Sequence, residues 1–479
     1  MSLPGGSLQS FYERAESIAK SLSSISEEDG VLVISHLDAD GLSAGSIMLQ
    51  ALLNRGISPM MRIVKQLDGD VVEEILKCSH RFIIFTDLGS GQKSLLKRIE
   101  GKELIVVDHH QPEQVELKML ELNPHLFGFD GSSELSAAGT AYILAVKMDE
   151  RNKYLANLAI VGALGDIQDK GERSTLVGIN AKIAEDAEKA GILTVKKGLK
   201  LYGFESRPLV QCMEYTLEPF LPGLSGDEGA CYKFIKDLGI DPRRPDGSWK
   251  SIADLTREDQ RTVINGVIKY LISHGLTSRE AESIVGAIYI FPSESPDGPL
   301  RDAREFSSSI NACGRLGRYG LGISICLGDR ERALAELKEV AQEYKRAISG
   351  CLKWIGDNKG AIRILPHVQA IYGGTQIDDK MIGTIVSIAF NTKPFTTDRP
   401  IVGFASTAGV VKVSARGTPD LVKRGLNLGK VMKEASEKLG GTGGGHNIAA
   451  GAQIPAGKED EFLDSADEIF AKTILGVKL

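Results

Sequence analysis

Residues 31–41 read VLVISHLDADG, an apolar run that ends in a turn rich in carboxylates. The run carries no charge before its end and predicts a buried strand over 31–35. Further strands are predicted at 60–64, at 81–86 (RFIIFT) and at 103–107 (ELIVV), with helical spacing at 42–54. Strands that alternate with helices indicate βαβ units, so we predict an α/β fold around a parallel sheet.

Acidic and imidazole side chains follow the predicted strands at the point where each strand ends. The carboxyl ends of parallel strands meet at one edge of a sheet, where functional groups gather. A further cluster, GDIQD at 165–169, follows an apolar helix predicted over 151–164 and can return to the same edge. The side chains expected there are His36, Asp38, Asp40, Asp87, Asp108, His109, His110 and Asp166.

Carboxylates in one pocket repel each other unless they are protonated or bound to divalent cations. Oxygen and imidazole ligands suit manganese, magnesium or iron, and the thiolates of structural zinc sites are missing. There are more candidate ligands than one ion needs, so we expect two cations about 3.5–4 Å apart. Asp87 or Asp166 alone is explained by an ordinary turn or helix cap, and HLDADG alone by an acidic loop as well as by a site. Asp108-His109-His110 after an apolar strand is harder to explain in this way, and the order of all four clusters along the strands indicates a site.

The composition is that of a soluble globular protein with several domains. The 479 residues are 42% hydrophobic and 25% charged, and no apolar stretch is long enough for a transmembrane helix. The N-terminus, MSLPGGSLQS, lacks the features of a signal peptide, and the six cysteines form no CxxC pair. We therefore expect a cytoplasmic protein with reduced thiols and no membrane partner. The net charge of -6 does not indicate a nucleic-acid-binding protein, but it fits a site built from carboxylates.

A glycine run, GGTGGG at 440–445, precedes His446. Consecutive glycines let backbone N–H groups approach an anion, and we expect a helix N-terminus to follow them. No Lys-Ser/Thr pair follows, so the run is not a P-loop. We interpret it as a phosphate clamp, with a flexible loop as the alternative.

Four motifs together resemble those of the DHH phosphoesterase superfamily: HLDADG, TDLGSG, VVDHHQP and GDIQD. GGTGGGHNIAAGA (440–452) and KVSARGT (412–418) resemble the DHH-associated domain. SSSINACGRLGR (307–318) is similar to a segment of RecJ-type single-strand nucleases, especially the archaeal RecJ-like proteins. The resemblance covers residues 25–180 and 300–479, and leaves a helix-rich middle region without a chemical motif.

The sequence pattern and the resemblance together predict five segments. They are an N-terminal leader and helix (1–25), a catalytic DHH domain with a parallel sheet (26–180), a helical inserted domain (181–300), a connecting segment with a long linker helix (301–355) and a smaller α/β C-terminal substrate-binding domain (356–479).

The resemblance also implies roles for single residues. One cation would be held by His36, Asp38 and Asp87. The second would be held by Asp40, Asp87, His109 and Asp166, with Asp87 bridging the two. Many RecJ proteins have Asp where this chain has His36; Mn²⁺ is expected, with Mg²⁺ as the alternative.

Among the residues with catalytic roles, Asp108 would orient His109, and His110 would face the scissile phosphate. Arg416 and His446 would offset charge on the phosphoryl oxygens. The implied substrate-binding residues are Asn311, Arg315, Ser414, Arg416, Gly443, Gly444, Gly445 and His446.

The implied function is exonucleolytic hydrolysis of single-stranded DNA or RNA to nucleoside monophosphates, in DNA replication or repair. Three alternatives stay open. One is a replication scaffold that binds the GINS complex with little catalysis. Another is a phosphodiesterase for a small substrate such as nanoRNA or a cyclic dinucleotide, which the long middle region disfavours. The third is an inorganic pyrophosphatase, which needs no long insertion. Polarity and the choice between DNA and RNA stay open as well.

Overall fold

The computed structural model describes residues 7–99, 101–204, 207–216, 221–390, 392, 394–407 and 409–474. The predicted leader at the N-terminus lies largely outside these residues. Within them the chain forms two compact units, Met1–Ala341 and Gln342–Leu479. None of the described helices is long and apolar enough to cross a lipid bilayer.

The first unit is built on a parallel five-stranded sheet, and the predicted α/β fold is confirmed. The strand order is β2-β1-β3-β4-β5. The strands are β1 (Val31–His36), β2 (Met60–Val64), β3 (Phe82–Thr86), β4 (Glu103–Val107) and β5 (Leu120–Leu122). Because all pairings are parallel, the carboxyl ends of the strands lie at one edge.

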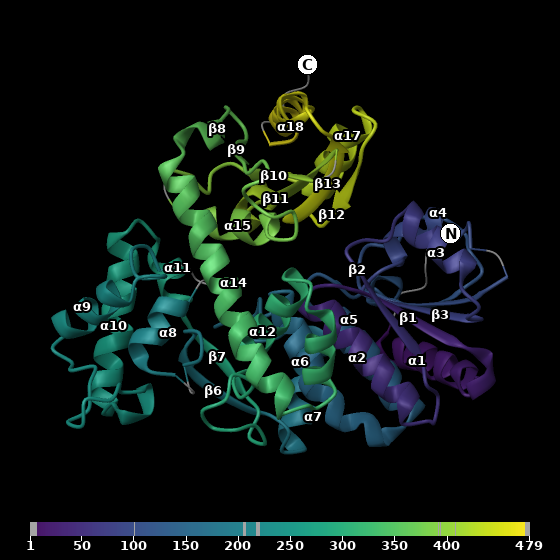
Figure 1. Cartoon of the computed structure of the whole chain (residues 1–479), viewed down its shortest axis with the longest axis horizontal. Coiled ribbons are helices and arrows are strands. Elements are labelled where there is room, and N and C mark those ends of the chain that lie inside the picture. Colours follow the sequence, from purple (N-terminus) through teal and green to yellow (C-terminus); the bar gives the residue numbers. More distant parts are fainter. Residues whose placement is uncertain are drawn as a thin grey trace. The chain divides into compact units, whose positions relative to one another are not determined.

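Helices cover both faces of this sheet, as Figure 1 shows. One face packs against α3 (Gly69–Lys77) and α4 (Lys93–Leu96), in a core that includes Ile34, Phe85 and Val106. The other face packs against α2 (Ala39–Leu53) and α5 (Ala137–Met148), with α1 (Leu8–Leu22) against α5. Burial on both faces explains why the three central strands, β1, β3 and β4, are nearly continuous apolar runs.

The helix α6 (Ala156–Gly165) packs against α2 and α5 and is followed by α7 (Gly178–Lys189). It is apolar around its whole circumference, with eight of its residues buried. Such a helix is held inside the protein. Its C-terminal end carries the GDIQD segment to the sheet edge.

An antiparallel ribbon carries the middle region. Its strands are β6 (Thr194–Leu199) and β7 (Val285–Ile290), and Leu199 pairs with Val285. Between them lie α8 (Leu209–Tyr215), α9 (Glu228–Asp237), α10 (Arg257–Ser273) and α11 (Ser278–Glu282), around a separate hydrophobic core. These helices belong to the first unit, and the chain enters and leaves them through paired strand ends.

Three helices follow the ribbon. They are α12 (Ala303–Arg315), which packs against α6 and α2, α13 (Tyr319–Cys326) and α14 (Arg332–Asp357). The long charged helix predicted at 330–355 corresponds to α14, along which the two units meet in sequence.

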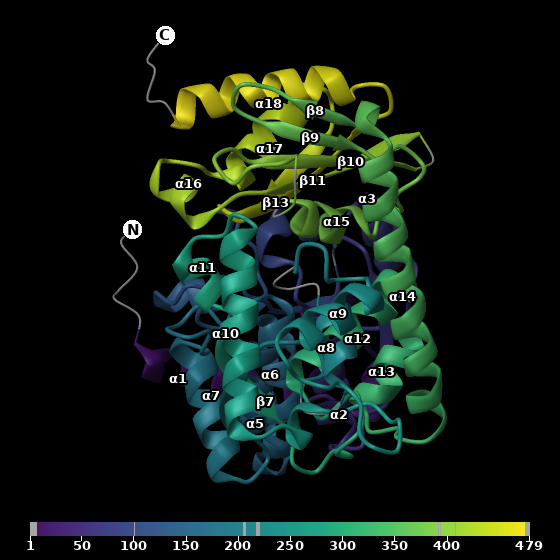
Figure 2. The same ribbon diagram turned by 90° about the vertical axis from the view of Figure 1, so that its left-hand side faces the viewer.

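The second unit contains a six-stranded sheet of order β12-β13-β11-β10-β9-β8. Its strands are β8 (Ile362–Ile364), β9 (Gln369–Tyr372), β10 (Ile401–Thr407), β11 (Val410–Arg416), β12 (Thr442–Gly445) and β13 (Ala449–Pro455). Figure 2 shows α17 (Leu428–Glu437) and α18 (Glu459–Ile474) on one side of this sheet and α15 (Ile382–Ala389) on the other. The short α16 (Pro419–Lys423) follows β11.

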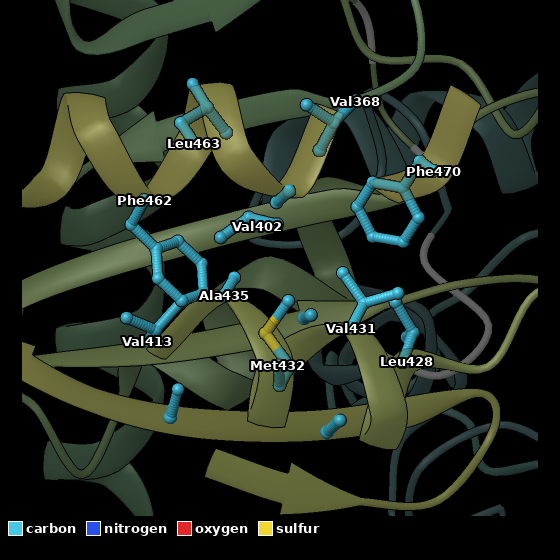
Figure 3. Packing of buried hydrophobic residues seen from close by; sticks show 14 of the residues in the cluster. Val368, Val402, Val413, Leu428, Val431, Met432, Ala435, Phe462, Leu463 and Phe470 are labelled. Carbon is cyan, nitrogen blue, oxygen red and sulfur yellow. The ribbon is translucent and has the colours of Figure 1, made fainter. Parts of the chain in front are cut away.

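The core of the second unit lies between its sheet and the pair α17 and α18. Phe462 and Phe470 of α18 reach toward Met432 of α17 and Val413 of β11 (Figure 3). Alternate residues of β11 face the opposite side, toward α15, as the side-chain period of a strand requires.

The interpretation of the glycine run is wrong in one respect. Residues 442–445 form the edge strand β12, and the next element is strand β13, so no helix N-terminus follows the glycines. Glycine fits here because β12 crosses α17 closely: a Cβ on Gly443 would lie 2.4 Å from the carbonyl oxygen of Met432.

Candidate metal centre

A first triad of possible ligands forms where β1 and β3 end. His36 is the last residue of β1, Asp38 is the N-cap of α2, and Asp87 follows β3. Nδ1 of His36 lies 2.9 Å from Oδ2 of Asp38 and 3.5 Å from Oδ2 of Asp87. Gly41 permits this turn, since a Cβ there would lie 2.4 Å from the carbonyl oxygen of His36.

A second triad lies beside the first and consists of Asp40, His109 and Asp166. Asp40 is in the first turn of α2, and Asp166 is the C-cap of α6. Nε2 of His109 lies 3.3 Å from Oδ2 of Asp166 and 3.8 Å from Oδ2 of Asp40.

Asp87 reaches both triads. Its Oδ1 lies 3.2 Å from Nε2 of His109, while its Oδ2 faces His36. Asp87 also has a left-handed backbone, with φ at 59°, which is uncommon for a residue other than glycine. Its N–H donates to the carbonyl of Val107 at 3.1 Å, which holds this conformation. The two oxygens of one carboxylate are thus arranged as a bridge between two ligand sets.

The charges of the site fit divalent cations. Burial, with the nearby carboxylates of Asp166 and Asp87, raises the pKa of Asp40 well above its usual range. Burial likewise raises the pKa of Asp166 to about 6, and His109 opposes that shift. Desolvation disfavours a charged imidazole at His36, but Asp38 and Asp87 outweigh it and raise the pKa of His36 to about 10. Carboxylates that resist ionisation without cationic neighbours, together with imidazole nitrogens, are the donor set of a two-cation site.

Asp108 contacts both histidines of its motif, and its Oδ1 accepts the backbone N–H of His109 at 2.7 Å. Oδ1 of Asp108 also accepts from the ring nitrogen Nδ1 of His110 at 2.8 Å, so the ring that Asp108 holds is that of His110. The ring of His109 is held by Gly131, whose carbonyl oxygen accepts from Nδ1 at 2.6 Å and leaves Nε2 facing the carboxylates. Nε2 of Gln168 donates to the same carbonyl at 2.8 Å.

Gly131 and Gln168 were not predicted. Gln168 lies inside the GDIQD segment, so a signal existed, whereas Gly131 acts through its backbone and has none. Gly131 must lack a side chain, because a Cβ would lie 1.9 Å from the carbonyl oxygen of His109.

Two predicted substrate-binding residues lie on α12, in the first unit. The end of this helix packs on the turn after β1: a Cβ on Gly314 would lie 1.7 Å from the carbonyl oxygen of Leu37. Burial raises the pKa of Asp38, but His36 and then the Arg315 guanidinium lower it below its usual range. Arg315 is therefore in electrostatic reach of the first triad, and Asn311 lies one turn earlier on α12.

The other predicted substrate-binding residues gather on the sheet of the second unit. Ser414 and Arg416 lie on β11, facing α15, where Nε of Arg416 donates to Oγ of Ser387 at 2.8 Å. Gly444 of β12 and Ser414 are both register partners of Gly451 on β13. The remaining members of this group are Gly443, Gly445 and His446, on β12 or directly after it.

Three family models match the chain. The N-terminal domain of the DHH family matches residues 30–165, the DHH-CID domain 201–285 and the DHHA1 domain 367–472. An uncharacterized protein of Methanocaldococcus jannaschii is 32% identical over 453 residues, which cover 93% of this chain and 94% of that protein. A putative prophage-derived single-strand DNA-specific exonuclease of Bacillus subtilis is 27% identical over 199 residues, 38% of this chain and 33% of the relative.

Solved structures share the fold. RecJ from Thermus thermophilus in complex with Mn²⁺ has a TM-score of 0.57 at 18% identity, and the similarity covers 98% of this chain but 56% of RecJ. CDC45 from Entamoeba histolytica has a TM-score of 0.62 at 11% identity and covers 97% of this chain and 98% of CDC45. The chain therefore spans about half the length of the first of these relatives and nearly all of the second.

Proposed function

The chain belongs to the DHH family, and from this premise we propose that it is a two-metal phosphodiesterase that degrades single-stranded nucleic acid. One observation carries the proposal: two ligand triads lie side by side, and the carboxylate of Asp87 faces both. A pair of divalent cations in such a site activates water and stabilises the attacking and leaving oxygens of a phosphoryl displacement. Mn²⁺ is the ion we expect, and Mg²⁺ is the alternative.

Different side chains would bind the cations and contact the substrate. His36, Asp38 and Asp87 would hold one cation, and Asp40, Asp87, His109 and Asp166 would hold the other. His110 is the exposed histidine of the site, with 39% of its side chain accessible. Asp108 accepts from its Nδ1. Burial lowers the pKa of His110, but Asp108 outweighs it and raises that pKa, and the protonated ring would also donate from Nε2 to a phosphoryl oxygen.

Nucleic acid is the substrate class that we propose. It is supported by the relative from Bacillus subtilis, which is described as a single-strand DNA-specific exonuclease, and by the fold shared with RecJ. Within the second unit, Ser414, Arg416, His446 and the glycines of β12 would bind the phosphates of the strand. Arg315 and Asn311 of α12 would bind it in the first unit. We propose that the products are nucleoside monophosphates.

A role in DNA replication or repair, a cytoplasmic location and binding to the GINS complex belong to the same proposal. A catalytically silent scaffold is the alternative. The presence of every proposed ligand, gathered within reach of its partners, favours the enzyme.

The test is incubation with Mn²⁺ or Mg²⁺ and end-labelled single-stranded DNA and RNA, with product length followed over time. We expect mononucleotides from single strands and little product from duplex. Asp87→Ala should lower the rate by more than about 100-fold, since losing even a residue that supports a metal ligand costs roughly 10–100-fold. Asp246→Ala, in an exposed loop of the insertion, is the matched control and should keep full activity. Undiminished cleavage by Asp87→Ala would refute the two-metal proposal.

A further inference from the structure

A buried ion pair lies behind the metal centre and belongs to neither triad. Nζ of Lys93, on α4, lies 2.8 Å from Oε2 of Glu121, on β5, and each side chain is 9% exposed. Taking two charges out of water costs more than such a pair usually returns in stability. A buried ion pair is therefore better explained by a geometry that it enforces than by stability.

The ion pair is the start of a chain of hydrogen bonds. The hydroxyl of Ser90 donates to Oε1 of Glu121 at 2.8 Å and accepts from Nδ2 of Asn123 at 2.8 Å. Nδ2 of Asn123 also donates to the carbonyl oxygen of His110 at 2.9 Å. The side chains of Ser90 and Asn123 are fully buried.

A second branch reaches the ring of His110. The N–H of Ser90 donates to Oδ2 of Asp108 at 2.9 Å, and Oδ1 of Asp108 accepts from Nδ1 of His110 at 2.8 Å. The hydrogen bonds that hold the carbonyl and the ring of His110 are therefore both connected to Ser90.

The charges set the direction of these bonds. A carboxylate without a proton can only accept, so the hydroxyl of Ser90 has to donate toward Glu121. The lone pairs of the Ser90 hydroxyl then face Asn123, whose two side-chain N–H groups donate to Ser90 and to His110. Nζ of Lys93 lies against Oε2 of Glu121, so Oε1 is the oxygen that faces Ser90, and one arrangement of the network is selected.

We propose that Ser90, held by the Lys93–Glu121 ion pair, is a positioning residue that fixes His110 for contact with the substrate phosphate. The inference rests on the proposed function, and it assigns a role in the reaction to groups that touch neither cation nor substrate. The hydroxyl of Ser90 acts through Asn123 on the backbone of His110, whereas the backbone N–H of Ser90, which Ser90→Ala retains, holds Asp108.

The main test removes one hydroxyl in two backgrounds. Ser90→Ala should lower kcat by about tenfold, a loss of the size that a supporting residue causes, with KM unchanged. In a His110→Ala background the same change should have no further effect, because the residue through which Ser90 acts is gone. Mn²⁺ affinity, followed by calorimetric titration, should be equal in all four proteins. Ser46→Ala removes a hydroxyl that is equally buried, on α2, and should leave kcat unchanged.

A second readout does not depend on activity. In protein labelled with ¹⁵N at its eight histidines, the Nδ1 proton of His110 should exchange with solvent faster in Ser90→Ala than in the wild type. Glu121→Gln should accelerate the exchange in the same way. This variant replaces Ser90→Ala in the measurement if Ser90→Ala does not fold.

The outcomes separate the two claims. A wild type that cleaves no strand with either metal contradicts the proposed function, and the exchange measurement still decides the role of Ser90. Unchanged kcat and unchanged exchange in Ser90→Ala would overturn the positioning role. An equal loss of kcat in both backgrounds would overturn it as well, because the hydroxyl would then act on stability alone.

Discussion

Glycine at position 162 lets α6 pass beside the buried carboxylate of Asp40. A Cβ at this position would lie 2.3 Å from Oδ1 of Asp40 and 2.4 Å from Cβ of Ala138. Asp40 cannot withdraw, because its oxygens accept the N–H groups of Ala137 and Ala138 at 2.8 and 2.9 Å. One missing methyl group thus keeps a proposed ligand in place.

Gly162→Ala should therefore lower the free energy of unfolding by about 1–3 kcal/mol, the usual cost of overpacking, and weaken Mn²⁺ binding. Urea denaturation and metal titration measure the two effects. Gly350→Ala is the matched control, since this glycine lies in α14 with open space around it. The control should be slightly more stable than the wild type, by roughly 0.5–1 kcal/mol. Wild-type stability and metal affinity in Gly162→Ala would contradict the prediction.

Ile167, next to the proposed ligand Asp166, has a left-handed backbone with φ at 54°. The N–H of Ile167 donates to the carbonyl of Leu164, and the N–H of Gln168 donates to the carbonyl of Ala163. This pair of hydrogen bonds ends a helix and normally has glycine at the position of Ile167. A β-branched residue is strained there, and the side chain of Ile167 is exposed. Ile167→Gly should stabilise the protein by about 1 kcal/mol, which thermal denaturation can measure. A lower melting temperature would mean that contacts of the isoleucine outweigh its strain.

At the scale of elements, the N-cap of α12 is a buried carboxyl group, Asp302, with a raised pKa. Oδ1 of Asp302 caps the helix by accepting the N–H groups of Arg304 and Glu305. Burial, and then the charge of Glu305, raise the pKa of Asp302 to about 6. The protonated form is thus favoured in the folded state. Its stabilising contribution is complete below the unfolded pKa, near 3.8, and is lost as the pH rises through about 6.

Asp302→Asn keeps the capping oxygen and removes the titration. Relative to the wild type, the variant should gain stability as the pH rises from about 4 to above 6. The expected gain is on the order of 2–3 kcal/mol, at 1.36 kcal/mol per pKa unit. Urea denaturation at several pH values measures it. A difference that does not vary with pH would show that Asp302 is not the group responsible.

The elements also show what the sequence can predict. The predicted bounds of β2 and β4 agree with the structure. For β4 the reason is that a strand buried on both faces is a short apolar run with polar ends, whereas β2 is a partly exposed edge strand. β5 was missed: it has three residues, and Glu121 in its middle carries a charge that only the buried partner Lys93 explains. The glycines of β12 have low β-propensity, and they pair in a strand because β13 lies beside them.

The candidate site likewise has a part that the sequence predicts and a part that it does not. The proposed ligands could be predicted because each follows a strand or helix end, and the topology of a parallel sheet brings such ends together. The supporting contacts could be predicted only in part: Asp108 was expected, but its contact with the ring of His110 was not. Gly131 contacts His109 through a backbone carbonyl, and Asp108 turns toward His110 because of local side-chain geometry. Neither contact leaves a periodic pattern in the sequence.

At the scale of the whole molecule, every proposed metal ligand belongs to the first unit. Scanning calorimetry of the full chain should therefore show that Mn²⁺ raises the melting transition of the first unit and leaves that of the second unchanged. At a Mn²⁺ concentration about 100 times the dissociation constant the gain is about 2.7 kcal/mol. Chelation should reverse the shift, and Asp87→Ala should reduce it strongly. A shift of both transitions by the same amount would place the ions elsewhere.

The pairing of Leu199 with Val285 makes the helical insertion a detachable module. A tight turn that joined these two residues would close an ordinary hairpin and leave the sheet and its metal edge untouched. The excision would strip one side of α12, however, because Arg207 of the insertion forms an ion pair with the buried Glu305. A shortened enzyme would need a neutral side chain at that position, since an abandoned buried carboxylate is costly. Chains with and without such a module could thus interconvert through one loop and one compensating substitution.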